Sequence, residues 1–127
     1  MEIVYLALKD GIKTDLLNAV EHVISDMNRK LENGNTGDAK PGRIKNFIVS
    51  LEHLIVRIKN AADENFNITK IEAEDISSVI SCFGSMLLEV EEPEKVEGVT
   101  LKGLLKLFSL KDTISCQTKM QTLSFMR

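Results

Sequence analysis

The feature that most constrains the fold of this chain is the helix-forming segment of residues 43–62. On an α-helix, apolar side chains at intervals of three and four residues form one continuous stripe. The members of this stripe are Ile44, Phe47, Ile48, Leu51, Leu54, Ile55 and Ile58. Other parts of the chain must cover a stripe of this length, so the segment predicts a helix that is central in a bundle.

A second and narrower apolar strip lies on another side of the same expected helix. Val49 and Val56 are about two helical turns apart and have Glu52 between them. Lys45 and Lys59 flank this strip. Two apolar residues with a charge between them on a polar side resemble a helix-docking strip, so Val49, Glu52 and Val56 are candidate partner-binding residues. The alternative is that the N-terminal segment covers both valines.

Length and composition favour one soluble domain built from helices. The chain has 127 residues, of which 43% are hydrophobic and 28% charged, and its few aromatic residues suit helix packing better than a β-sandwich. The N-terminal segment resembles neither a signal peptide nor a membrane span. Cys82 and Cys116 lack the short spacing of paired cysteines. We therefore expect reduced thiols, a cytoplasmic location and no membrane contact.

Two further long helices are predicted before and after the central one. An amphipathic stripe over residues 14–32 begins at Thr14, a candidate N-cap, and ends at Asn33-Gly34, where glycine suits a left-handed C-cap. After a loop rich in turn residues, Pro41 suits the first turn of the central helix, at residues 42–62.

The third long helix is predicted over residues 70–90. Thr69 and Glu72 have the spacing of a capping box, in which each side chain bonds a free backbone amide of the other residue. Gly84 lies inside this helix, where glycine is unfavourable, and predicts a close helix crossing. An acidic linker is expected at residues 91–100.

The two ends of the chain are ambiguous. Residues 2–9 fit a helix that breaks near Gly11, which we favour, but they also fit a short strand. Residues 113–127 fit a helix or a strand equally well. Two terminal strands could pair in a small sheet.

The C-terminal segment is basic. Residues 101–127 carry five Lys/Arg against one Asp/Glu, whereas residues 63–100 carry two against ten. The segment could dock on the acidic middle of its own chain, which we favour, or it could present a basic surface to another molecule.

The basic segment also resembles the helix-turn-helix pattern of many DNA-binding regulators. A first helix would end before a turn at residues 109–112, and a second would begin at Thr113. In this motif the second helix enters the major groove. The resemblance covers about twenty residues. It implies the nucleic-acid-binding residues Lys106, Lys111, Thr113, Ser115, Gln117 and Lys119.

Residue patterns for catalysis or metal binding are weak. Residues 63–74 place oxygen ligands at several positions of a calcium loop, but Ile68 occupies the position of the turn glycine. His22 and His53 are isolated, and they could join the two cysteines in a zinc site only from four distant segments. We expect no enzyme activity, cofactor, metal or small-molecule substrate.

The sequence therefore predicts an all-α fold, a single-domain bundle of four to six helices with short strands possible at the two termini. Residues 1–90 would form the core helices, residues 91–100 the acidic linker and residues 101–127 a basic C-terminal helical pair. We expect a protein–protein interaction module that acts as an adaptor, inhibitor or regulatory subunit, with another protein or a second copy as its partner. DNA binding through residues 101–123 is the alternative.

Overall fold

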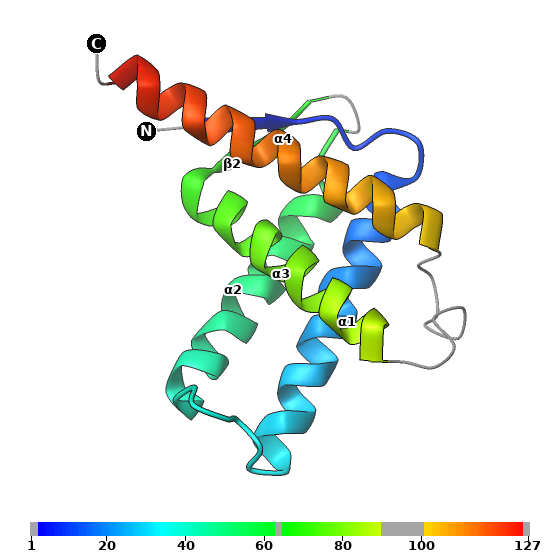
Figure 1. Cartoon of the computed structure of the whole chain (residues 1–127), viewed down its shortest axis with the longest axis vertical. Helices are drawn as coiled ribbons and strands as arrows, with labels where there is room; N and C mark the ends of the chain where they lie inside the picture. Colours follow the sequence, from blue (N-terminus) through cyan, green and yellow to red (C-terminus); the bar gives the residue numbers. More distant parts are fainter. Residues whose placement is uncertain (1–2, 63–64, 90–100, 126–127) are drawn as a thin grey trace.

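The computed structural model of the chain describes residues 3–62, 65–89 and 101–125 (Figure 1). Within these residues the elements follow the order β1 (Ile3–Leu6), α1 (Ile12–Glu32), α2 (Pro41–Lys59), β2 (Phe66–Thr69), α3 (Lys70–Glu89) and α4 (Leu101–Phe125). The predicted helical class is confirmed, and four helices is the lower end of the expected range. The expected acidic linker at 91–100 lies outside the described residues.

Helix α1 occupies the centre of the bundle. It forms an antiparallel hairpin with α2, and α3 crosses this hairpin. Helix α4 runs above α3 and alongside it, and crosses the upper end of α1 in Figure 1. Contacts join α1 to α2, α3 and α4, whereas α2 contacts mainly α1 and makes a smaller contact with α3. The prediction that α2 is the central helix is therefore wrong. Because α2 packs at the side of the bundle, one of its faces stays open.

The hydrophobic core lies where α1, α2, α3, α4 and the strands meet. The α2 stripe predicted from the sequence faces this core through the buried residues Ile44, Ile48, Leu51, Leu54 and Ile58. The largest fully buried side chains of the described residues are Phe83, Leu6, Leu8, Leu16, Leu51, Leu54, Ile58, Ile68, Ile76, Ile80, Leu107 and Val4. Burial of these apolar groups is the main stabilising contribution to the fold.

The N-terminal segment is a strand, so the preferred helical interpretation of residues 2–9 is wrong. Val4 and Leu6 are buried while Ile3 and Tyr5 are exposed, which is the alternation of a strand with one covered face. The partner of β1 is β2, in an antiparallel ribbon that pairs Ile3 with Thr69 and Leu6 with Phe66.

The C-terminal segment contributes no strand within the described residues, because α4 is one continuous helix. The expected turn at residues 109–112 and the helical pair are therefore wrong. Leu107, Leu110 and Ile114 are all buried, and their spacing continues one helical stripe through the expected turn. Ser109 and Asp112 lie on the exposed side of the same helix, where polar residues do not interrupt it.

The boundaries of α1 and α2 follow local backbone chemistry. Helix α1 begins after Gly11, whose φ of 83° is left-handed, so the predicted N-cap at Thr14 is wrong. Its C-terminal end is confirmed: Gly34 has a φ of 67°, and the N–H of Asn35 donates to the C=O of Lys30 at 2.9 Å, as in a Schellman cap. Pro41 opens α2, as predicted.

Gly84 marks a close crossing of α3 and α4, as predicted. A Cβ atom at this position would lie 2.8 Å from Cζ of Phe108. Gly103 allows a second close approach, because a Cβ atom there would lie 2.9 Å from Oδ2 of Asp15. Glycine at both positions lets α4 lie close to α3 and α1.

Candidate docking surface

The valines predicted for partner binding lie on the open face of α2. Val49 is 51% exposed and Val56 is 58% exposed, and Glu52 between them is exposed. The N-terminal segment does not cover them, because β1 is held against β2 and α4. We call Val49, Glu52 and Val56 the α2 strip.

Two rows of polar residues border Val49 and Val56, and Glu52 of the α2 strip belongs to the first. At about 100° of rotation per residue, the two valines have one row on each side. The first row contains Lys45, Glu52 and Lys59, and the second contains Asn46, His53 and Asn60; all six are exposed. The second row is not among the partner-binding residues predicted from the sequence, although the same helical spacing places it beside the valines.

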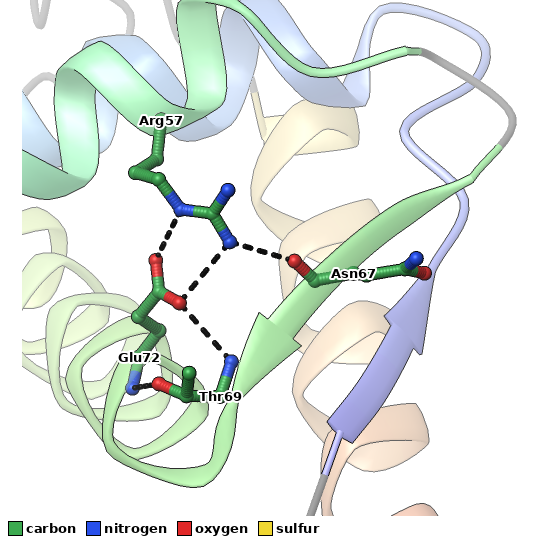
Figure 2. A network of polar contacts seen from close by, with 4 residues as sticks. All are labelled: Arg57, Asn67, Thr69 and Glu72. Carbon is green, nitrogen blue, oxygen red and sulfur yellow. Dashed lines mark hydrogen bonds and ion pairs between the residues drawn. The ribbon is translucent and has the colours of Figure 1, made fainter.

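The C-terminal half of α2 is anchored to β2 and α3 by Arg57 (Figure 2). Its Nε donates to Oε2 of Glu72 at 2.9 Å, and one Nη donates to Oε1 of Glu72 at 3.2 Å and to the C=O of Asn67 at 2.8 Å. The guanidinium also lies 5.5 Å from the centroid of the Phe66 ring, within cation–π range. These contacts fix which way the α2 strip faces.

Glu72 also completes the predicted capping box of α3. The N–H of Thr69 donates to Oε1 of Glu72 at 3.1 Å, and the N–H of Glu72 donates to Oγ1 of Thr69 at 3.2 Å. Burial acts to raise the pKa of Glu72, but hydrogen bonds from Arg57 and Thr69 outweigh it, so this pKa lies below its ordinary value. Because residues 66–69 are a strand and α3 starts at Lys70, the residues with calcium-loop spacing do not form such a loop.

Replacing Glu72 by Gln is expected to lower the free energy of unfolding by about 1 kcal/mol at pH 7. The pKa of Glu72 is lower in the folded chain, so its stabilising contribution is full above the ordinary value of about 4.3 and is lost as pH falls through the folded-state value. The difference between wild type and variant should therefore narrow from pH 7 to pH 3, as measured by urea unfolding followed by circular dichroism. Glu74→Gln, at an exposed position, is the control, and a difference independent of pH would contradict this account.

Both outer edges of the β1–β2 ribbon are occupied by side chains. On β1, the side-chain amide of Gln117 accepts from the N–H of Tyr5 at 2.8 Å and donates to the C=O of Tyr5 at 2.6 Å. On β2, the C=O of Asn67 accepts from Arg57. Such contacts prevent further strand pairing. They give Gln117, one of the predicted nucleic-acid-binding residues, a structural role.

Two lysines of the DNA-binding alternative also contact other parts of the domain, and Thr113 bonds its own helix. Lys106 donates to the C=O of Asp10 at 2.6 Å, and Lys111 donates to Oγ of Ser81 at 2.5 Å. Thr113 donates to the C=O of Ser109 at 3.1 Å. The side chain of Lys119 lies outside the described residues. Lys111 reaches the acidic middle only through a serine hydroxyl, and Lys106 contacts residue 10, so electrostatic docking of the basic segment on the acidic middle stays a prediction.

Ser115, the remaining residue of that alternative, lines an open groove of about 550 Å³ between α3 and α4. The lining residues are Lys70, Ala73, Glu74, Ser77, Ser78, Ile114, Ser115 and Thr118. The polar part of this lining combines serine and threonine hydroxyls with one carboxylate, Glu74, and one ammonium group, Lys70.

The residues considered for a metal site remain dispersed. Among the described residues, no group of three or more His, Cys, Asp and Glu side chains is arranged to hold a metal ion. His22 lies beside the ring of Phe83, with centroids 5.8 Å apart, and burial raises the pKa of the half-buried Cys82 thiol. None of the helices in the described residues has the length and apolar character to span a membrane.

Comparisons of the chain with family models, with curated proteins and with solved structures found no match. The surface chemistry of the described residues is therefore the basis for a functional hypothesis.

Proposed function

We propose that this chain is a non-catalytic protein-binding module of the cytoplasm, which docks on its partner through the α2 strip. The observation that carries this proposal is the exposure of Val49 and Val56, at 51% and 58%, on a helix whose opposite face is in the core. Both valines are more exposed than buried, and a partner helix or groove could cover them together.

The energetics favour a reversible contact. Covering the remaining exposed surface of each valine would contribute about 1 kcal/mol, which is half of the value for complete burial of such a side chain. The flanking charges would add mainly orientation and specificity. A contact of this strength suits an adaptor, an inhibitor or a regulatory subunit that associates and dissociates.

DNA binding by residues 101–123 receives no support from the described geometry. The helix-turn-helix arrangement requires a turn between two helices, and α4 is continuous through residues 109–112. Lys106, Lys111 and Gln117 contact the domain itself. No specific observation favours this second function.

Replacing Val49 and Val56 together by Asp is expected to abolish binding to protein partners without unfolding the chain. Two carboxylates would have to be desolvated in the contact, at a cost larger than the contribution of the valines. The test is capture of defined partner proteins from an extract by wild type and variant, with circular dichroism to confirm helicity. Ser25→Asp with Asn28→Asp adds the same charge at exposed positions of α1 and should bind as wild type does. Unchanged capture by the α2 variant would contradict the proposal.

A further inference from the structure

We propose that the partner of the α2 strip is a second copy of this chain, docked so that the two α2 helices run parallel about a two-fold axis. This inference rests on the proposed function and identifies its partner. It is carried by the way in which the two polar rows beside Val49 and Val56 complement each other.

A two-fold axis parallel to α2 brings unlike rows together. Each valine meets the same valine of the second copy, while the Lys45, Glu52 and Lys59 row of one copy lies beside the Asn46, His53 and Asn60 row of the other. Glu52 then lies beside His53 of the second copy, and symmetry makes this contact twice. The carboxylate can accept a hydrogen bond from an imidazole N–H.

The ends of the two rows are also compatible. Lys45 lies beside Asn46 of the second copy, and Lys59 lies beside Asn60 of the second copy. An asparagine carbonyl accepts from a lysine ammonium group. The parallel arrangement therefore covers four valines and places no two like charges opposite each other.

The antiparallel arrangement is less favourable. Its two-fold axis is perpendicular to the helices, so each row meets the same row of the second copy. When the valines overlap fully, with Val49 opposite Val56, the carboxylate of Glu52 lies opposite Glu52 of the second copy, and Lys45 lies opposite Lys59. Like charges in direct opposition weaken association. The parallel arrangement, which avoids these like-charge oppositions, is therefore favoured.

The contact is small, so the dimer exchanges rapidly. One helix face per copy is below the range of about 1,200–2,000 Å² that stable protein interfaces bury. Self-association should therefore be measured at concentrations up to the millimolar range, by sedimentation equilibrium of the full chain.

A charge exchange tests the arrangement. His53→Glu alone should weaken self-association by about five- to tenfold, because it places two carboxylates together at each of two symmetric contacts. The double variant Glu52→Lys with His53→Glu should associate at least as tightly as the wild-type chain, since the parallel dimer then places an ammonium group beside a carboxylate at both contacts. A double variant no tighter than His53→Glu alone would overturn the parallel arrangement.

Disulfide cross-linking gives an independent result. In a Cys116→Ser background, Val49→Cys should form a covalent dimer on mild oxidation, because the two positions face each other across the axis within disulfide distance. Ser50→Cys, exposed but away from the α2 strip, is the matched control and should not cross-link. Equal cross-linking at both positions would overturn the proposal.

Failure of this inference can be distinguished from failure of the proposed function. A wild-type chain that is monomeric at millimolar concentration overturns the second copy as partner. If Val49→Asp with Val56→Asp still abolishes capture of a different protein, the α2 strip remains a docking surface. If the wild-type chain is monomeric and the variant Val49→Asp with Val56→Asp captures partner proteins as the wild-type chain does, the proposed function is overturned as well.

Discussion

Replacing Leu51 by Asp is expected to unfold the protein. Leu51 is fully buried on the core face of α2, and the substitution removes its apolar contacts and places a carboxylate among apolar side chains. The combined cost is about 5 kcal/mol or more, which is comparable to the whole stability of many small domains. Circular dichroism should show loss of helicity at 25 °C or a large fall in the urea midpoint.

Val49→Asp is the matched control for Leu51→Asp. The two positions are on the same helix and receive the same charge, but Val49 is 51% exposed. Its replacement should change the free energy of unfolding by about 1 kcal/mol or less, because the new carboxylate remains in water. Similar losses for the two variants would contradict the assignment of one face of α2 to the core and the other to solvent.

Replacing Phe83 by Ala is expected to lower the free energy of unfolding by about 3–5 kcal/mol. Phe83 is fully buried on α3, and its ring lies 5.8 Å from that of His22 on α1. The close crossing of α3 and α4 at the neighbouring Gly84 leaves the surrounding helices little freedom to fill the cavity. Urea unfolding followed by circular dichroism measures the loss.

Ile71→Ala is the control for Phe83→Ala, because Ile71 is on the same helix but is 71% exposed. Its replacement should change the free energy of unfolding by about 0.5 kcal/mol or less. A comparable effect at the two positions would show that α3 does not pack on α1 through the face that includes Phe83.

The sequence predicted those parts of the fold that depend on local spacing. The two apolar sides of α2 follow from helical periodicity alone, so the buried position of Leu51 could be expected, whereas the sequence left open whether the N-terminal segment covers Val49 and Val56. The capping box of Thr69 and Glu72 also involves neighbours in the chain. Such features need no knowledge of the tertiary structure.

Features that depend on long-range contacts could not be predicted in this way. The strand identity of residues 3–6 depends on pairing with Phe66–Thr69, sixty or more positions away. The polar residues near 109–112 suggested a turn, but the buried stripe that includes Leu107, Leu110 and Ile114 keeps α4 continuous.

The same limit applies to the site. Gln117 fitted a nucleic-acid-binding position by sequence, yet its amide bonds Tyr5, which is 112 positions away. Arg57 had no local signal for its contact with Glu72 and Asn67, and that contact fixes the orientation of α2. The residues of the α2 strip could be chosen from the sequence, because exposure on a helix follows its periodicity once one core face is known.

A dilution series of ¹H–¹⁵N spectra of the wild-type chain tests most directly whether the α2 strip associates. The amide signals of Lys45, Asn46, Val49, Glu52, His53, Val56, Lys59 and Asn60 should shift together with concentration and fit one dissociation constant. Signals of the β1–β2 ribbon and of the groove between α3 and α4 should stay in place. Spectra that do not change up to millimolar concentration, or shifts centred on α4, would contradict the account.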